Sequence, residues 1–206
     1  MDLSHPFRAL LPGVESDVLT VLAASTKPRT GREVARLADR SQRGTQLVLS
    51  RFVNHGLVLM EEAGNSRVYT LNREHLAAEP FERLANLRGA LFRRLSDEVF
   101  HNWRPQPTHL SVFGSAARGD GGLDSDIDIF LVRPGDVEAD EEEWRERVEG
   151  LANAVFRWTG NHAGIAEVGL EELERLRREQ PAIVESLRAD AVDIAGIPVR
   201  ELLRGV

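Results

Sequence analysis

Two aspartates that stand two residues apart, Asp126 and Asp128, carry the clearest chemical signal in the sequence. They lie at the start of residues 127–132, a run of apolar residues that is predicted to form a strand. Because strand side chains alternate between faces, both carboxylates point the same way, whereas Ile127 and Ile129 point into the core. Two neighbouring anions repel each other and resist burial, so they require a cation. Oxygen ligands with no His or Cys nearby favour Mg²⁺ or Mn²⁺.

A turn upstream of these aspartates has the composition of a phosphate-binding segment. Gly114 and Ser115 stand where a predicted strand, residues 110–113, passes into a short helix or turn. Such a turn exposes backbone N–H groups and a hydroxyl to a phosphate, and a residue without Cβ lets the phosphate approach the backbone. Arg118 lies at the edge of the same turn and can neutralise phosphate charge. The two segments together indicate a site for a phosphorylated ligand and a cation.

In combination these residues resemble the DNA polymerase β nucleotidyltransferase superfamily, and most closely its minimal nucleotidyltransferases. The family motif is Gly-Ser, ten intervening residues and Asp-x-Asp, which stands here as Gly114-Ser115, residues 116–125 and Asp126-Ile127-Asp128. The resemblance covers residues 105–200, about half of the chain. It implies a polymerase β-like palm, a small mixed sheet flanked by helices. A solvated strand start after a glycine turn is the alternative interpretation of the same residues.

The resemblance also implies roles for individual residues. The superfamily places a third carboxylate on a following strand, where Glu167 is the match, although Glu replaces the commoner Asp. Two metal ions would then bridge the carboxylates and a nucleoside triphosphate, ATP being the expected substrate. The predicted catalytic and metal-binding residues are Asp126, Asp128 and Glu167, and the predicted nucleotide-binding residues are Gly114, Ser115, Arg118 and Ser125.

The N-terminal part resembles the winged helix-turn-helix of bacterial regulators. Ser16 is predicted to cap a helix over residues 17–24. Thr30, with Glu33 three residues on, has the spacing of a capping box and begins a second helix. Ser41 begins a third, which ends at Asn54, and two β-prone runs around a Gly-Asn-Ser turn (residues 64–66) predict a hairpin, the wing.

Charge favours DNA as the partner of this module. Residues 27–51 contain seven Lys+Arg and two acidic residues. The helix of residues 41–54 is predicted to read DNA through Arg43, Thr45 and Gln46, and Arg67 beside the wing turn to contact the backbone or minor groove. Winged helices also serve in protein interaction and dimerisation, and that alternative stays open.

Composition and charge indicate two domains in an α+β chain. The 206 residues carry 26 Lys+Arg and 33 Asp+Glu, a net charge of −7. The charge is unevenly distributed, since residues 1–104 have a net charge of +3 and residues 105–206 one of −10. The predicted organisation is a winged helix domain (1–78), a connecting amphipathic helix over 80–103 with a Pro-containing linker (79–104), and a nucleotidyltransferase domain (105–206).

The expected function is metal-dependent transfer of a nucleoside monophosphate, AMP by resemblance, from a triphosphate to a protein or RNA. In some members of this family the transfer occurs within toxin–antitoxin pairs, with a HEPN-type ribonuclease as partner. The alternative is a DNA-binding regulator whose C-terminal domain senses nucleotide without turnover. A homodimer is also expected. Zero cysteines exclude disulfides and thiolate metal sites, and without a signal-like or long apolar run the expected location is the cytoplasm, with no membrane partner.

Overall fold

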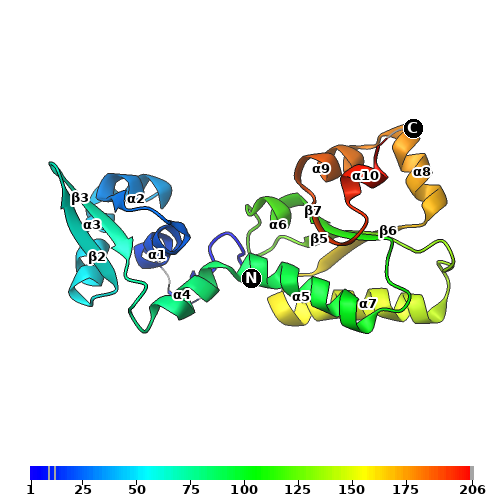
Figure 1. Cartoon of the computed structure of the whole chain (residues 1–206), viewed down its shortest axis with the longest axis horizontal. Helices are drawn as coiled ribbons and strands as arrows, with labels where there is room; N and C mark the ends of the chain where they lie inside the picture. Colours follow the sequence, from blue (N-terminus) through cyan, green and yellow to red (C-terminus); the bar gives the residue numbers. More distant parts are fainter. Residues whose placement is uncertain (9, 12, 205–206) are drawn as a thin grey trace. The chain divides into compact units, whose positions relative to one another are not determined.

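The protein consists of two compact units, described here from a computed structural model that covers residues 1–8, 10, 11 and 13–204. One unit is formed by Asp2 and Ser4–Leu87, and the other by Met1, Leu3 and Arg88–Val206 (Figure 1). The boundary between them falls inside the segment that was expected to connect two domains.

The N-terminal unit has the element order of a winged helix. Its helices precede and flank a three-stranded antiparallel sheet of order β1-β3-β2. The elements are α1 (Val14–Ala24), β1 (Arg29–Thr30), α2 (Gly31–Leu37), α3 (Gln42–Asn54), β2 (Val58–Ala63), β3 (Ser66–Leu71) and α4 (Ala78–Ala85). The predicted third helix and the wing hairpin are therefore confirmed.

Local hydrogen bonds explain where two of these helices begin. The Thr30 hydroxyl accepts from the Glu33 backbone N–H at 3.3 Å, and the Glu33 carboxylate accepts from the Thr30 N–H at 2.8 Å. This is the predicted capping box. Ser41 caps α3 by accepting from the Gly44 N–H at 3.2 Å.

Two expected helix boundaries are wrong. α1 begins at Val14 after Gly13, not at Ser16, whose buried hydroxyl donates back to the Gly13 carbonyl at 2.9 Å. The amphipathic segment of residues 80–103 forms two helices, α4 and α5 (Leu87–Asn102), instead of one. Asn86 separates them because its backbone (φ −105°, ψ 29°) leaves the helical region.

The C-terminal unit is built on a four-stranded mixed sheet of order β6-β5-β4-β7. β5 is parallel to β6, whereas β4 is antiparallel to both β5 and β7. Besides α5, the elements are β4 (His109–Phe113), α6 (Gly114–Arg118), β5 (Ile127–Val132), α7 (Glu142–Thr159), β6 (Ala163–Val168), α8 (Leu170–Glu179), α9 (Ala182–Asp190), β7 (Val192–Gly196) and α10 (Val199–Leu202). This is the α+β architecture that the sequence predicts.

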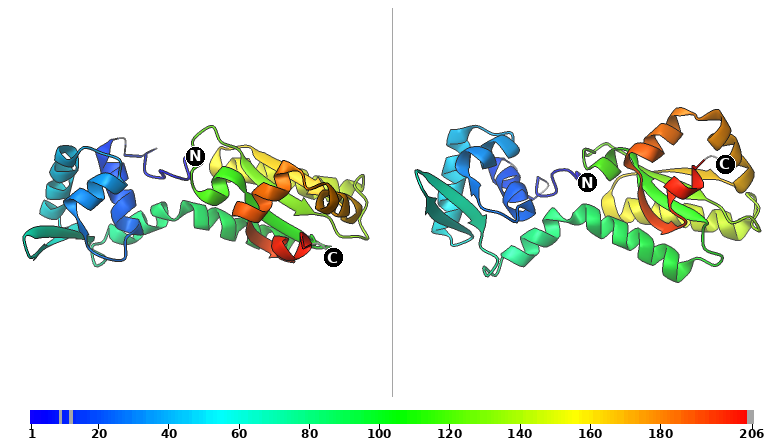
Figure 2. Two further views of the ribbon diagram at one scale, coloured as in Figure 1. Left: turned by 90° about the horizontal axis from the view of Figure 1, so that it is seen from above. Right: turned by 45° about the horizontal axis from the view of Figure 1, so that its top comes forward.

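Helices cover both faces of this sheet. α5 and α7 lie on one face, and α8, α9 and α10 lie on the other (Figures 1 and 2). On β5, Phe130 and Val132 pack in one core cluster with Val184 and Leu187 of α9. The intervening residues Ile127, Ile129 and Leu131 are buried as well, at most 2% exposed. β5 is therefore a central strand whose alternation fixes which side chains reach each face.

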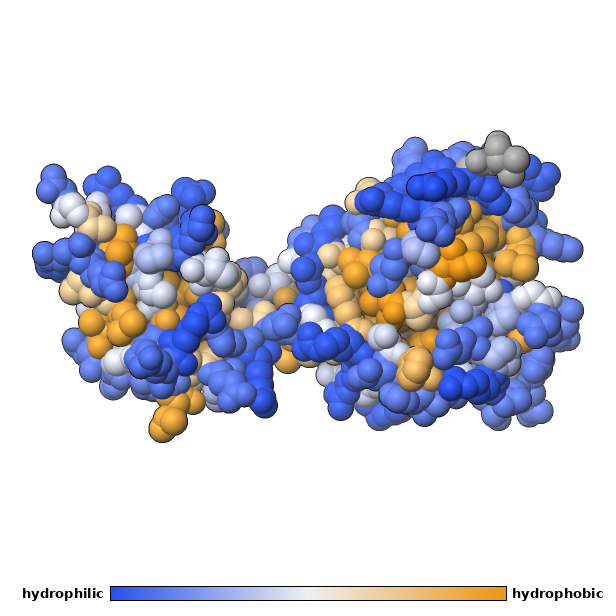
Figure 3. Space-filling view, viewed as in Figure 1, coloured by the Kyte–Doolittle hydropathy of each residue, from blue (hydrophilic) through white to orange (hydrophobic). Residues whose placement is uncertain are grey.

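Side chains on the visible surface of each unit are largely hydrophilic, with an apolar area over the sheet below α10 in the C-terminal unit (Figure 3). In the part of the chain that the structure describes, no helix combines the length and the apolarity that crossing a bilayer requires.

Candidate active site

Asp126 and Asp128 lie where the loop that follows α6 enters β5. Asp128 shares its sheet face with Phe130 and Val132, because strand residues two apart point the same way. This is the face that α8–α10 cover, and the carboxylates lie at its open end, beyond the apolar cluster of α9. Asp126 is exposed and Asp128 is half-buried. Asp126 precedes the first residue of β5, so strand alternation places only Asp128, and Asp126 lies close enough to raise the pKa of the Asp128 carboxyl.

Glycines from two neighbouring segments make room for the Asp128 carboxylate. A Cβ on Gly114 would lie 2.5 Å from Asp128 Oδ2, and one on Gly164 would lie 3.3 Å from Asp128 Oδ1. Gly114 also has a φ of +68°, a conformation that side chains disfavour. Gly164 pairs with Asp128 across β5 and β6, so its missing side chain opens the same face. Space is thus reserved around a carboxylate in a position where side chains could have filled it.

The electrostatic environment of Asp128 disfavours its charged form. Burial raises the pKa of this carboxyl, and the negative charges of Asp126 and Asp190 raise it further, against a smaller opposing effect of Arg118. A nearby cation would reverse this balance. The electrostatics of the pair therefore fit the binding of a cation.

The Gly114–Arg118 turn, which is α6, presents the expected phosphate-binding groups beside this carboxylate. The Arg118 guanidinium contacts Asp120 at 3.0 Å and Asp190, the last residue of α9, at 2.6 Å. Arg88, at the start of α5, donates to the carbonyl of Ala117 at 2.7 Å and thereby holds the end of the turn. Of the predicted residues, Gly114 and Arg118 lie near Asp128, and Ser115 belongs to the same turn with its hydroxyl toward Gly121.

The loop between the turn and β5 is fixed by one buried amide. Asn161 is 4% exposed and donates from Nδ2 to the carbonyls of Leu123 (3.0 Å) and Ser125 (2.9 Å). The Ser125 hydroxyl accepts from the Gly122 N–H at 2.9 Å. This predicted nucleotide-binding residue therefore stabilises the turn of residues 122–125. Because Asp126 follows directly, these bonds position the first carboxylate.

Glu167 does not join the aspartates, and its assignment as third carboxylate is wrong. It pairs with Leu131 in the β5–β6 register, so it points to the opposite face from Asp128. There its carboxylate accepts from Trp144 Nε1 of α7 at 2.9 Å and from Arg133 at 2.5 Å. The β6 positions on the Asp128 face are Gly164, Ala166 and Val168, none of which has a side chain that can bind a cation.

The remaining donors fit a divalent cation that binds few protein ligands. Among the described residues, no group of three or more His, Cys, Asp or Glu is placed to hold a metal ion. Mg²⁺ is often held by only one or two carboxylates and completes its coordination with water and substrate phosphates. Asp126 and Asp128 match that donor set, and the glycines at 114 and 164 leave space for the Asp128 carboxylate itself.

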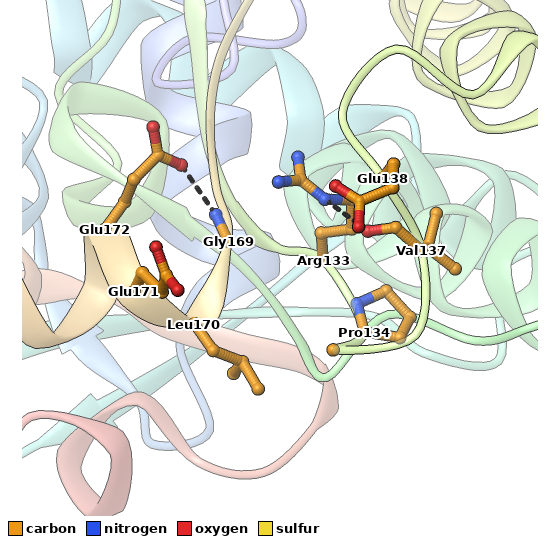
Figure 4. A pocket seen from close by; sticks show the side chains of 9 residues that line it. Arg133, Pro134, Val137, Glu138, Gly169, Leu170, Glu171 and Glu172 are labelled. Carbon is orange, nitrogen blue, oxygen red and sulfur yellow. Dashed lines mark hydrogen bonds between the residues drawn. The ribbon is translucent and has the colours of Figure 1, made fainter.

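A pocket at the far end of β5 and β6 has a different character (Figure 4). It is lined by Arg133, Pro134, Gly135, Val137, Glu138, Gly169, Leu170, Glu171 and Glu172. Arg133 already donates to the Val137 carbonyl (2.8 Å) and to Glu167, and Glu172 accepts from the Gly169 N–H. Arg133 and Glu172 are therefore already bonded within the protein, which favours the Asp126–Asp128 end as the site of chemistry.

Three residues that sequence reasoning missed contribute to the candidate site: Gly164, Asn161 and Asp190. Gly164 pairs with Asp128 across β5 and β6 and leaves space for its carboxylate. Asn161 holds the loop that leads to Asp126. Asp190 is 72 residues from Arg118 in the chain, and only the packing of α9 on α6 brings it there. An acidic residue before the last strand was a visible feature of the sequence, but no motif connected it to the site.

The mixed sheet, the paired aspartates and the adjacent glycine turn define an enzyme class that transfers phosphate-containing groups. Residues 92–204 match the model of the nucleotidyltransferase domain family. The match spans more than half of the chain, and the chain belongs to this family. It is therefore a transferase, of the kind that moves a nucleoside monophosphate from a nucleoside triphosphate.

Other comparisons add little. No curated protein matches the chain. A solved structure of human N-acetylserotonin methyltransferase in complex with SAM is similar at 21% identity and a TM-score of 0.29, over 48% of this chain and 30% of that chain. The chain thus spans less than a third of that enzyme's length, and so weak a likeness carries no argument about function.

We expect Gly114→Ala to weaken nucleotide binding by at least about tenfold, since the new Cβ collides with Asp128 and the positive φ costs about 1–3 kcal/mol. Titration calorimetry with ATP and Mn²⁺ measures this. Gly150→Ala is the control, because nothing lies within 4 Å of its Cβ. Unchanged binding in Gly114→Ala would remove the turn from the site.

Asp128→Asn is expected to raise the melting temperature of the C-terminal unit at neutral pH in EDTA. The folded pKa of Asp128 lies above its unfolded value, so the stability that protonation provides is present at low pH and is lost as pH rises through the folded pKa. The Asn side chain avoids this loss. The difference from wild type should therefore shrink as pH falls through that pKa.

Tryptophan fluorescence follows this transition selectively, because Trp103, Trp144 and Trp158 all lie in the C-terminal unit. The exposed Asp136→Asn change should give the same melting temperature as wild type at each pH in this range, because Asp128 is retained. A lower melting temperature for Asp128→Asn at neutral pH contradicts the electrostatic account.

Proposed function

We propose that this protein transfers AMP from ATP to a hydroxyl of a protein or RNA, with Mg²⁺ or Mn²⁺ as cofactor. The observation that carries the proposal is the half-buried Asp128 carboxylate, which lies beside Asp126 in a space that two glycines leave open. A strand with this much uncompensated negative charge is costly to fold, and a cation with its triphosphate supplies the missing charge balance. ATP as the donor rests on the family resemblance.

The chain's residues divide the work of the reaction. Asp126 and Asp128 would hold the cation, which would supply positive charge to the α-phosphate and to the departing pyrophosphate. Arg118 and the Gly114 N–H orient the phosphates. The acceptor oxygen forms a bond to the α-phosphorus, the bond to the β-phosphate bridging oxygen breaks, and the hydroxyl proton passes to an aspartate or to water.

The biological setting we propose is a minimal nucleotidyltransferase of a toxin–antitoxin pair, joined to a winged helix. Its acceptor is then a HEPN-type ribonuclease or an RNA. The support is the spacing Gly114-Ser115, ten residues, Asp126-x-Asp128, which folds here into one turn and strand entry. A homodimer belongs to the same proposal.

Labelled ATP tests the transfer directly. With Mn²⁺ and either cellular RNA or protein as acceptor, label from [α-³²P]ATP should become covalently attached, whereas label from [γ-³²P]ATP should not. Asp126→Asn and Asp128→Asn should each reduce attachment by at least about 100-fold, because the cation loses a ligand. Asp136→Asn, in an exposed loop, should retain it. Attachment of the γ label would identify a kinase instead.

One observation favours the sensor alternative. The third carboxylate that the resemblance implies is absent from the Asp128 face of β6, where Gly164 and Ala166 stand. If the protein binds ATP but attaches no α label to any acceptor, it is a nucleotide sensor. Retained DNA binding in Asp126→Asn would then separate the two units' functions.

We further propose that the N-terminal unit binds DNA. A groove runs between the start of α2, the start of α3 and the wing, and its lining includes Arg32, Gln42, Gln46 and Arg67. Arg43 is also exposed on α3, and Gln46 is oriented by donating to the Tyr69 hydroxyl at 2.9 Å. The basic charge and polar amides in one groove support base and phosphate contacts.

Thr45 does not belong to this surface, so its place on the polar side of the helix was wrongly predicted. Its side chain is fully buried, because α3 turns this position toward the core of the unit. Arg8 and Arg40 are also excluded as candidate DNA contacts, because both form ion pairs with the buried Asp17. The candidate contacts that remain are Arg43, Gln46 and Arg67.

A gel shift with DNA from the protein's own promoter region tests this proposal. Arg43→Ala and Arg67→Ala should each weaken binding by about tenfold and lower the salt slope by about one. Arg83→Ala is the matched control, because Arg83 is 78% exposed on α4 and paired with Glu79. Binding that does not depend on salt, or equal losses in all three variants, counts against the groove.

A further inference from the structure

Asp190 stands at the end of α9 with its carboxylate directed at the Gly114–Arg118 turn. Its side chain is 12% exposed although it belongs to an otherwise solvated helix end. Oδ1 accepts from the Gly114 backbone N–H at 3.2 Å, and Oδ2 accepts from Arg118 Nη1 at 2.6 Å. One carboxylate thus engages the two donors expected to bind phosphate.

The position of Asp190 is unfavourable apart from these two bonds. An acid in the last turn of a helix faces the negative end of the helix dipole. Asp190 also lies near Asp128, whose pKa it raises. The cationic Arg118 and the Gly114 N–H are what offset these repulsions. The bonds made by a carboxylate at this point are those that a phosphate oxygen pair could make in its place.

We propose that Asp190 acts as an internal competitor for the phosphate-binding groups, and that an incoming nucleoside triphosphate displaces it. In the free protein Asp190 occupies Arg118 and the Gly114 N–H; in the complex the triphosphate takes both, and the Asp190 side chain turns to solvent. This inference rests on the proposed nucleotide-binding function. It assigns Asp190 as the residue that sets nucleotide affinity, distinct from the cation ligands Asp126 and Asp128.

Asp190→Asn tests the proposal through binding alone. In EDTA, where no cation contributes, the variant should bind ATP about threefold to tenfold more tightly than wild type by titration calorimetry, because Arg118 loses one of its two carboxylate partners and keeps only Asp120. Binding of Mn²⁺ alone, followed by electron paramagnetic resonance, should stay unchanged. Weaker Mn²⁺ binding would make Asp190 a metal ligand, and weaker ATP binding would make it a residue that orients Arg118; either result overturns the proposal.

Two further variants separate competition from simple charge removal. In an Arg118→Ala background the gain from Asp190→Asn should disappear, whereas through-space repulsion would preserve it and overturn the proposal. Glu185→Gln removes one charge from the exposed side of the same helix and should leave ATP affinity unchanged. Tryptophan fluorescence checks that each variant remains folded.

The ATP-binding measurements also distinguish failure of this inference from failure of the proposed nucleotide-binding function. If wild type and Asp190→Asn both fail to bind ATP with or without Mn²⁺, the proposed function fails and the inference fails with it. If wild type binds ATP and Asp190→Asn binds it no more tightly, the inference alone is overturned.

Discussion

The C-terminal unit holds the Asp128 carboxylate half-buried beside a second carboxylate. No cationic side chain forms an ion pair with Asp128 among the described residues, and this constraint shapes the surrounding fold. The cation nearest to Asp128, Arg118, is bonded instead to Asp120 and Asp190. Repulsion at such a position must be offset by the rest of the fold. The buried Ile127 and Ile129 fix the strand, and the glycines at 114 and 164 prevent side chains from filling the space. The two carboxylates thus lower the stability of the fold locally, in favour of ligand binding. Burial of the apolar strand supplies the stability that is lost.

The same sheet separates the carboxylates of Asp128 and Glu167, which have different roles. Asp128 and Glu167 lie on adjacent strands, but the register places them on opposite faces. Glu167 is satisfied by Arg133 and Trp144, so its role is to join β6 to α7. A shift of one residue in the β5–β6 register would exchange these environments, leaving Glu167 without its partners and filling the open face. The register is therefore as important to the site as the identity of its residues.

Short-range patterns in the sequence predicted the parts of this protein that depend on neighbours in the chain. The capping box of Thr30 and Glu33, the alternation of β5 and the spacing from Gly114 to Asp128 are of this kind. The β5–β6 register could not be predicted, because the two strands are separated by α7. Glu167 is the carboxylate on the following strand, but its position in that strand does not say which face it shares with Asp128. Thr45 was assigned to the surface because it is polar, whereas helix phase buries it. Asp190 depends on packing between distant helices, which leaves no local signal.

Net charge acquires a physical meaning once these contacts are known. The C-terminal half has a net charge of −10, which opposes an anionic substrate such as a triphosphate. A positively charged binding surface is therefore not how this unit can attract nucleotide. In the function proposed above, a cation recruited by the two aspartates would convert part of the negative charge into attraction, and release of Arg118 by Asp190 would leave it paired only with Asp120. In such a site, the affinity for nucleotide depends on the exchange of the Asp190 carboxylate for a phosphate. The acidic composition is therefore compatible with phosphate binding, and it makes phosphate binding dependent on the bound cation.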